Sequence, residues 1–302
     1  MNIELSELIY PIFVKKGENL SEEIPLMPGI FRLSPDRLLR EVEELAGRGV
    51  KKFLIFGIPG RKSRRGNDAY SRDNIVSETI KAIRSRFEGI TIFTDVCLCA
   101  YTSHGHCGII KEREKSIDLK ETLKALSDMA ITHAEAGADY VAPSAMAEGQ
   151  VGAIRKALNA NGYKGTKIMA YSAKFNSNAY GPFRNAANSF PKFGDRSGYQ
   201  LDHSKKDEAL ERVREDIIQG ADIVMVKPAL WYLDMVNEVK NMIERPLAVY
   251  NVSGEYAMMK EGARIGLWEE KGIVKEIFSS MKRAGADLII TYYAKEISKW
   301  IK

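Results

Sequence analysis

The sequence is poor in the residues that form disulfides or bind soft metals, with three cysteines and four histidines in 302 residues. Cys97, Cys99 and Cys107 all lie in the stretch IFTDVCLCAYTSHGHCG. An odd number of cysteines cannot pair completely, so a disulfide framework is excluded. Three thiols this close in the sequence instead indicate a metal site.

Long apolar runs, a charged leader and a basic helix face are also missing. No run reaches the length of a membrane span, so we expect no transmembrane segment. No secretion leader opens the chain, which predicts a protein of the reducing cytoplasm. The formal net charge of +5 is spread along the chain, so we do not expect nucleic acid as a partner.

Eight short apolar runs alternate with segments of helical spacing, at 8–14, 52–58, 90–96, 138–144, 167–172, 221–227, 247–253 and 287–293. Several runs follow Gly-Ala-Asp, where glycine suits the left-handed residue past a helix end. Strand followed by helix, eight times over, predicts a single-domain (β/α)8 TIM barrel across residues 1–302. The alternative, a doubly wound open sheet, lacks its best signature because no G-x-G-x-x-G follows a strand.

Polar side chains recur where the predicted strands end. Because the carboxyl ends of barrel strands meet at one mouth, these side chains are expected to converge there. They are Asp95, Ser144, Ser172, Lys174, Lys227, Ser253 and Tyr292. The mouth is therefore the predicted site of chemistry.

The three thiolates favour zinc, since sulfur ligands select it among the common ions. Three protein ligands leave a fourth position open, which is typical of a catalytic site. His104 or His106 could instead complete a structural site, and the residues alone leave this open. A further alternative is that the cysteines are small buried hydrophobes.

Lys174 and Lys227 both follow apolar strands and have aromatic or apolar neighbours in the sequence. An ammonium group in apolar surroundings tends to lose its proton, and two at one mouth depress each other's pKa. A neutral amine near pH 7 can condense with a ketone to form a Schiff base. The alternative is a lysine that reaches outward or pairs with a carboxylate.

A long segment at 176–203, rich in Asn, Gly, Ser and Arg, follows the fifth predicted strand. A loop of this length is expected to be a lid over the site. Its Arg184 and Arg196 could hold a carboxylate bidentately, or could form structural ion pairs with Asp195 or Asp202. On the opposite side, the hydroxyls of Ser253 and Tyr292 could bind a second carboxylate.

These motifs closely resemble those of the porphobilinogen synthase (5-aminolevulinate dehydratase) family over essentially the whole chain. The matching segments are YPIFV, DVCLCAYTSHGHCG, YSAKF, YGPFR, GDR, MVKPALWYLD, YNVSGEY and KRAGADLIITYY. The resemblance implies a lyase that condenses two molecules of 5-aminolevulinate to porphobilinogen, with loss of water, in haem biosynthesis. The three cysteines match the zinc-dependent branch of this family.

The resemblance also implies roles for single residues. Lys227 would hold the first substrate as an imine in the P site, and Lys174 the second in the A site. The A-site carboxylate would be bound by Arg184, Arg196 and Gln200, and the P-site carboxylate by Ser253 and Tyr292. Asp95 and Ser144 would line the site, with Asp95 as a proton acceptor.

Two departures from the family pattern concern assembly and metals. The first predicted strand begins close to Met1, so we expect little or no N-terminal arm; a homo-oligomer is expected, but the octamer that the arm supports is left open. In magnesium-responsive relatives Glu208 would contribute to an allosteric magnesium site. Glu148 stands where the family pattern suggests Asp.

Two other functions are compatible with parts of the pattern. A Schiff-base aldolase barrel would need one lysine and no metal. A basic, zinc-stabilised nucleic-acid-binding protein would need a clustered basic face, which the sequence lacks.

Overall fold

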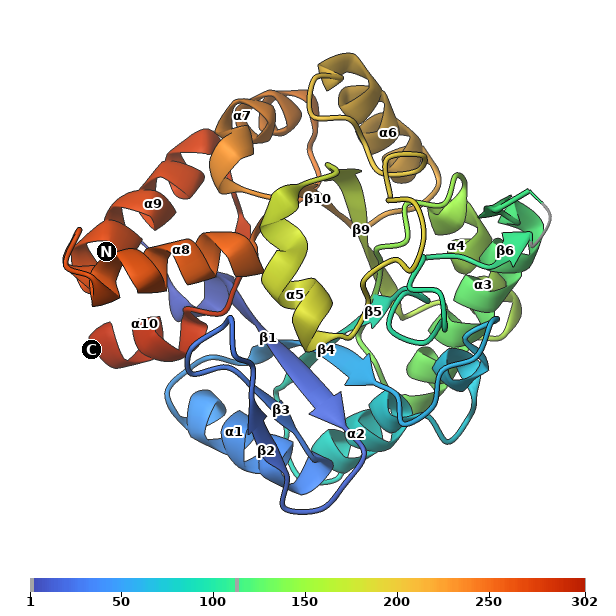
Figure 1. Ribbon diagram of the computed structural model, residues 1–302, viewed down its shortest axis with the longest axis horizontal. Coiled ribbons are helices and arrows are strands. Elements are labelled where there is room, and N and C mark those ends of the chain that lie inside the picture. Colours follow the sequence, from blue (N-terminus) through green and yellow to red (C-terminus); the bar gives the residue numbers. More distant parts are fainter. Residues whose placement is uncertain (1–2, 112–113, 302) are drawn as a thin grey trace.

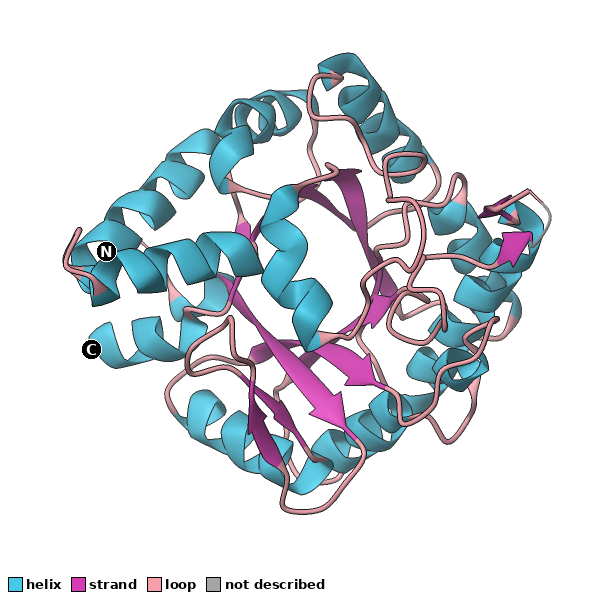
Figure 2. Ribbon diagram, in the orientation of Figure 1, coloured by secondary structure: helices cyan, strands magenta, loops and turns pink. Residues whose placement is uncertain are grey.

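The computed structural model describes residues 3–111 and 114–301. Its central feature is a closed barrel of eight parallel strands, in which each strand pairs with the next and the last pairs with the first (Figures 1 and 2). The strands are β1 (Leu8–Lys15), β4 (Lys52–Ile58), β5 (Thr91–Val96), β8 (Tyr140–Pro143), β9 (Lys167–Lys174), β10 (Ile223–Lys227), β11 (Leu247–Asn251) and β12 (Leu288–Thr291). All eight predicted runs are barrel strands, which confirms the predicted fold.

Helices surround the barrel, and one short helix, α5, crosses its mouth (Figure 1). Their bounds are α1 (Pro35–Gly47), α2 (Ile75–Arg84), α3 (Leu119–Ala136), α4 (Gln150–Ala160), α5 (Gly181–Ala186), α6 (Lys206–Ile218), α7 (Leu233–Met242), α8 (Ser253–Arg264), α9 (Glu270–Ala284) and α10 (Ala294–Trp300). None of the described helices is both long enough and apolar enough to cross a bilayer.

The helices pack through one apolar stripe, as α1 illustrates. It begins with Pro35, whose missing N–H costs nothing at a first helical position. Leu38, Val42 and Leu45 are fully buried, and their spacing places them on one face of the helix. The barrel strands are instead buried on both faces, and β10 and β11 are buried throughout.

Two short antiparallel strand pairs are present in addition to the eight barrel strands. β2 (Ser21–Glu23) pairs antiparallel with β3 (Phe31–Leu33), and β3 extends the sheet beside β1. β6 (Ile110–Lys111) pairs with β7 (Ser116–Ile117). Both pairs lie in segments that follow the carboxyl end of a barrel strand, so they border the mouth.

The Gly-Ala-Asp repeat joins helix, strand and neighbouring strand at the opposite end of the barrel. Asp287 accepts the backbone N–H of Leu247 at 2.7 Å and pairs with Lys240 at 2.7 Å. Gly285 has a φ of 113°, and a Cβ there would lie 2.5 Å from Cγ of Lys240. The same arrangement recurs with Asp139, Ile92 and Arg84, and with Asp222, Ile168 and Arg155. The repeat therefore ties neighbouring barrel strands together and leaves the mouth free for chemistry.

Candidate active site

Lys174 and Lys227 are register partners at the carboxyl ends of the neighbouring strands β9 and β10. The pairing of β9 with β10 shifts in register between Val224 and Val226 of β10. This irregularity changes the alternation of side chains along β9, so Tyr171 and Lys174 both point inward although they are three residues apart. The Nζ atoms of Lys174 and Lys227 lie 5.5 and 5.0 Å from the ring centroid of Tyr171. Both amines therefore stand at the same mouth, as the sequence predicted.

Aromatic rings enclose the amine of Lys227, whose residue is 6% exposed. Burial, followed by the charge of Lys174, lowers the pKa of Lys227 to about 7. A large share of this side chain is therefore an uncharged amine at neutral pH. Four ring centroids lie 4.1–5.4 Å from its Nζ, those of Tyr171, Tyr180, Phe183 and Tyr250.

Lys174 is buried like its partner and donates a hydrogen bond to the carbonyl oxygen of Ser144. Asp95, near the end of β5, is close enough to both lysines to interact with their charges. Burial raises the pKa of Asp95 to about 6, although the Ser144 hydroxyl and the lysines oppose the shift. Its Oδ1 is buried without a hydrogen-bond partner. Asp95 is thus poised to exchange a proton near neutral pH.

Ser172 does not belong to this group, so its predicted position at the mouth is wrong. Its side chain hydrogen-bonds the carboxyl group of Asp216 on α6, which lies in the helix layer. The irregularity in β9 explains the difference, because it turns Tyr171 and Lys174 inward and leaves Ser172 on the outer face. Simple alternation along the strand does not give this arrangement.

The three sulfur atoms of Cys97, Cys99 and Cys107 lie within 4.8 Å of one another, and all three residues are buried. Hydrogen bonds from Cys97 and Cys99, and then the charge of Arg196, hold the pKa of Cys107 well below its usual range. The pKa values of Cys97 and Cys99 are raised, chiefly by sharing those hydrogen bonds with Cys107. The cluster thus contains a ready thiolate for a soft metal ion.

Both nearby histidines have other partners. His106 uses Nδ1 with the hydroxyl of Tyr199 at 3.2 Å and Nε2 with the carbonyl of Phe193 at 3.0 Å. Within 3–111 and 114–301, the three cysteines are the sole His, Cys, Asp or Glu cluster that could hold a metal. The geometry therefore favours three protein ligands over a closed four-ligand site.

The predicted lid runs across the mouth and contains regular structure. The short helix η3 (Asn178–Tyr180) leads into α5, and irregular backbone follows. Arg32 donates from Nε to the carbonyl of Ala186 at 2.7 Å, so the N-terminal hairpin holds the end of α5. Gly105, in the cysteine-bearing segment, approaches so closely that a Cβ would lie 2.2 Å from the carbonyl oxygen of Phe190. The lid is thus packed against the sulfur cluster.

The lid arginines do not form the ion pairs considered above. Arg196 is 3% exposed and donates to the carbonyls of Gly105 at 3.0 Å and Ser189 at 2.6 Å. Asp195 and Asp202 are capped by their own neighbouring serines. In the described chain, five side-chain atoms of the lid are buried with no partner: Nε of Arg184, Oγ of Ser189, Nε of Arg196, and both amide atoms of Gln200.

The two hydroxyls on the far side have protein partners. Oγ of Ser253 accepts the N–H of Phe183 at 3.0 Å and donates to the carbonyl of Ala179 at 3.3 Å. The hydroxyl of Tyr292 lies 3.2 Å from that of Tyr250. Ser253 therefore joins the start of α8 to the lid, and a substrate carboxylate would have to exchange with these contacts.

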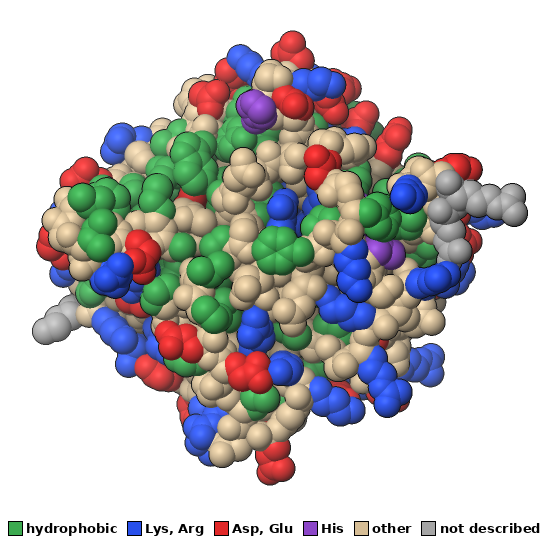
Figure 3. All heavy atoms as spheres, in the orientation of Figure 1, with side chains coloured by type: hydrophobic (Ala, Val, Ile, Leu, Met, Phe, Trp, Pro, Cys, Tyr) green, Lys and Arg blue, Asp and Glu red, His purple; other side chains and the backbone are tan. Residues whose placement is uncertain are grey.

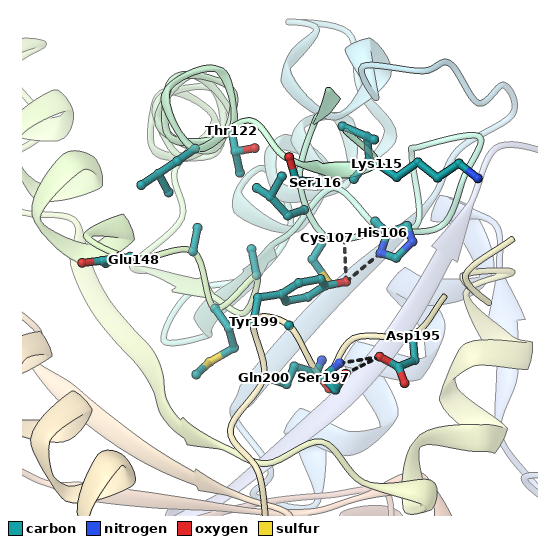
Figure 4. A pocket seen from close by; sticks show the side chains of 18 of the residues that line it. His106, Cys107, Lys115, Ser116, Thr122, Glu148, Asp195, Ser197, Tyr199 and Gln200 are labelled. Carbon is teal, nitrogen blue, oxygen red and sulfur yellow. Dashed lines mark hydrogen bonds between the residues drawn. The ribbon is translucent and has the colours of Figure 1, made fainter. Parts of the chain in front are cut away.

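A cavity of about 620 Å³ opens beside the sulfur cluster, and its lining includes Cys107 and Gln200 (Figure 4). Glu208 also lines this cavity. In the close view, Tyr199 points toward His106 and Cys107. Glu208 pairs with Lys205 at 3.3 Å and belongs to no carboxylate cluster among the described residues. Its magnesium role stays a prediction.

The face that carries the mouth is rich in positive charge. Figure 3 shows basic side chains gathered at its lower right, over the loop that follows β4. Lys62 in this loop donates to the carbonyl of Asn188 in the lid. Such a field attracts anionic small molecules toward the mouth.

A closed parallel barrel with two buried lysines beside three close thiols defines a class: barrel enzymes equipped for imine chemistry on carbonyl compounds. A family model described as delta-aminolevulinic acid dehydratase matches residues 1–300. The dehydratase of Methanothermus sociabilis is 51% identical over 291 residues, which are 96% of this chain and 90% of that one. The dehydratase of Halalkalibacterium halodurans is 45% identical over 299 residues, 99% of this chain and 90% of that one.

A solved structure agrees with these relatives. The Toxoplasma gondii delta-aminolevulinic acid dehydratase (porphobilinogen synthase), in complex with the reaction product porphobilinogen, superposes with a TM-score of 0.97 at 42% identity. The match covers 99% of this chain and 85% of that one. The chain belongs to the delta-aminolevulinic acid dehydratase family. Membership confirms the predicted resemblance and favours the dehydratase over the single-lysine aldolase.

Sequence reasoning expected aromatic neighbours for Lys174 but missed the aromatic rings around Lys227. Tyr171 precedes Lys174 by three residues, and regular alternation would place the two on opposite faces of β9. The register shift depends on pairing with β10, and nothing within β9 itself signals it. Phe183, expected only as part of the lid, also lies over Lys227 at 5.4 Å.

Proposed function

We propose that this protein condenses two molecules of 5-aminolevulinate to porphobilinogen, with loss of water, through imines on Lys227 and Lys174. The observation that carries the proposal is the pairing of these two buried lysines at one barrel mouth. Each substrate is a ketone, and a neutral amine converts a ketone into an imine that is a better electrophile. Two lysines allow both ketones to be activated while they remain distinguishable.

Lys227 holds the first substrate and Lys174 the second. The imine on Lys174 acidifies the neighbouring C–H of its substrate, and loss of that proton gives an enamine. The enamine carbon attacks the imine carbon at Lys227, whose nitrogen remains attached to that carbon as an amine. The amino group of the Lys227-bound substrate then adds to the imine carbon at Lys174, closes the ring and displaces Lys174. Elimination of the Lys227 amine with a ring proton, and loss of a second ring proton, gives the free pyrrole. Holding both substrates at one mouth makes the attack of the enamine intramolecular, which can contribute about 7–11 kcal/mol.

Asp95 is the proposed acceptor for the proton that leaves carbon. Burial raises its pKa to about 6, so it exchanges protons near neutral pH, and its Oδ1 has no protein partner. The Ser144 hydroxyl hydrogen-bonds this carboxyl group and orients it. The Asp95 side chain interacts with both lysines, so it can serve either imine.

The lid side chains form the second substrate's carboxylate site. Arg184, Arg196 and Gln200 keep buried donor atoms without partners, and a carboxylate would satisfy them. Burial works against the charge of Arg196, but the sulfurs of Cys107 and Cys99 raise its pKa, so it stays charged. Ser253 and Tyr292 supply neutral hydroxyls for the first substrate's carboxylate.

The sulfur cluster fits a zinc ion held by Cys97, Cys99 and Cys107. Zinc–sulfur bonds of about 2.3 Å need three sulfurs within about 4 Å of one another, and the observed separations are within 4.8 Å. When bound, zinc would act as a Lewis acid toward a substrate amine or a water. Magnesium at Glu208, a cytoplasmic location and a homo-oligomer are also part of the proposal, on the family pattern and the need for reduced thiols.

The decisive experiment mixes the protein with 5-aminolevulinate, zinc and a thiol reductant, and detects a pyrrole with an aldehyde colour reagent. Borohydride added during turnover should trap substrate on both Lys174 and Lys227, as located by peptide mass mapping. Adducts on one lysine, with no pyrrole, would support an aldolase instead. No pyrrole and no adduct would overturn the proposal.

A further inference from the structure

Glu255, in the first turn of α8, has a fully buried side chain whose carboxylate accepts three hydrogen bonds. Oε1 accepts the N–H of Leu230 at 2.7 Å. Oε2 accepts the N–H of Val252 at 2.9 Å and Nδ2 of Asn251 at 3.0 Å. Burial disfavours the charged form and raises the pKa of Glu255 to about 7. Because burial of a charged carboxylate is energetically unfavourable, its presence here indicates a specific role.

The two oxygens of this carboxylate hold two different loops of the mouth. Leu230 begins the short helix η4 (Leu230–Tyr232), which follows Lys227 at the end of β10 after Pro228 and Ala229. Asn251 ends β11, and Val252 precedes Ser253. Glu255 therefore connects the backbone that positions the imine lysine to the backbone that positions a carboxylate-binding hydroxyl.

The network continues to the next strand. The hydroxyl of Thr291, at the end of β12, donates to Oδ1 of Asn251 at 3.0 Å and accepts the N–H of Tyr293 at 3.0 Å. Tyr292 lies between these two anchored residues. The hydrogen bonds thus join the ends of β10, β11 and β12. Lys227, Ser253 and Tyr292, the three residues proposed to bind the first substrate, lie at or just beyond these ends.

We propose that Glu255 is a positioning residue that fixes the distance between the imine nitrogen of Lys227 and the carboxylate-binding hydroxyls of Ser253 and Tyr292. This inference rests on the proposed function. In 5-aminolevulinate two methylene groups separate the ketone from the carboxylate, and a rigid spacing accepts that chain and disfavours a longer one. Glu255 thereby selects 4-oxo acids at this site.

Glutamine cannot replace this carboxylate, because every partner is an N–H donor. The amide oxygen of Gln could serve either the Leu230 side or the Val252 side, and its NH2 group would face a donor on the other side. One loop must then move away from the other. Glu255→Gln is therefore a nearly isosteric change that breaks the hydrogen-bonded connection between the Leu230 and Val252 segments.

The test compares two keto acids that carry no amino group. 4-Oxopentanoate is the substrate without its amine, and 5-oxohexanoate has one more methylene between ketone and carboxylate. Borohydride trapping at Lys227, located by peptide mass mapping, gives the preference for one over the other. We expect a strong preference for 4-oxopentanoate in the unmodified protein, and a preference at least tenfold smaller in Glu255→Gln.

Glu41→Gln is the matched control. Glu41 lies on α1 in the helix layer, where its carboxylate accepts bonds from Lys295 at 2.7 Å and from the hydroxyl of Tyr10 at 3.3 Å. Loss of the Glu41 carboxylate should lower the stability of the protein without altering its preference for 4-oxopentanoate over 5-oxohexanoate. A general loss of rigidity would change both variants alike, whereas the positioning role changes Glu255→Gln alone.

Thr291→Val gives a second measurement that does not depend on the folding of Glu255→Gln. It keeps the side-chain volume and removes the hydroxyl that joins β12 to Asn251, so a smaller loss of preference is expected. An unchanged preference in either folded variant would overturn the inference. Failure of the proposed function would look different, since the unmodified protein would then form no adduct at Lys227.

Discussion

Lys174 and Lys227 are direct register partners on adjacent parallel strands, and their Nζ atoms lie 5.5 and 5.0 Å from the ring centroid of Tyr171. This pairing makes each amine part of the other's environment. The charge of Lys174 is the second largest cause of the low pKa of Lys227, after burial. The neighbouring charge of Lys174 thus helps to keep the Lys227 amine neutral.

Replacing either lysine with methionine, which keeps an unbranched chain and removes the amine, should abolish pyrrole formation. We expect a fall of more than about a thousandfold, since covalent activation of one ketone is lost. Lys174→Met should still be trapped by borohydride and 4-oxopentanoate at Lys227. Turnover by either variant above a few per cent of the unmodified rate would contradict the two-lysine mechanism.

Imine formation at Lys227 should become faster as the pH rises, because the neutral amine is the reactive form. With a pKa of about 7, its neutral fraction rises from about a tenth at pH 6 to about nine tenths at pH 8. The rate of trapping with 4-oxopentanoate should therefore rise about tenfold over this range. It should level off above pH 8.

Two substitutions should move this pH midpoint in opposite directions. Lys174→Met removes a like charge that lowers the pKa of Lys227, so the midpoint should rise. Asp95→Asn removes an opposite charge that raises it, so the midpoint should fall. Shifts of the same sign in the two variants would be incompatible with the electrostatic account.

Removing metal should stop turnover, and zinc should restore it. Zinc binding needs thiolates, but the pKa values of Cys97 and Cys99 are raised, so about two protons should leave on binding near neutral pH. Affinity should therefore weaken as the pH falls. Calorimetry of zinc binding to the chelated protein in buffers of different ionisation enthalpy measures the proton release; full activity without metal would contradict the assignment.

Gln200→Met should separate substrate binding from stability. Both amide atoms of Gln200 are buried without a partner, which costs about 1–3 kcal/mol, so removing them should leave the Tm unchanged or higher. The KM for 5-aminolevulinate should rise about tenfold, because a donor to the carboxylate is lost.

Gln219→Met is the matched control for this change. Oε1 of Gln219, at the end of α6, accepts the N–H of Gly152 on α4 at 3.0 Å, and neither residue is among those assigned to substrate. Its loss should lower the Tm slightly and leave the KM unaltered. A KM that stays constant in Gln200→Met would remove Gln200 from the carboxylate site.

Gly285→Ala should destabilise the barrel more than Gly162→Ala does. Both glycines have positive φ, 113° and 86°, so both variants pay the cost of a left-handed backbone, about 1 kcal/mol or more. At Gly285 a Cβ would also lie 2.5 Å from Cγ of Lys240, whereas nothing lies within 4 Å at Gly162. Chemical denaturation should give at least twice the loss of unfolding free energy for Gly285→Ala, and equal losses would contradict a role for close packing against Lys240.

The sequence by itself determined the barrel and the position at its mouth of most of the residues proposed for the active site. The eight strands are short, continuous apolar runs, a pattern set by burial on both faces and readable locally. Lys227 ends such a run, so its place at the mouth followed from the strand itself. The close spacing of Cys97, Cys99 and Cys107 likewise predicted their contact, since a short chain segment limits how far they can separate.

Only the tertiary structure decided which side chains face inward beside those residues. The register of β9 against β10 turns Tyr171 and Lys174 into the mouth and Ser172 out to α6, and β9 has no local signal for this shift. The partners of His106 come from a lid segment about ninety residues away, so its exclusion from the sulfur cluster could not be read from spacing. Nothing in the sequence distinguishes Glu255 from other first-turn carboxylates, because its hydrogen bonds to Leu230 and Val252 form only when the closed barrel brings the strand ends together.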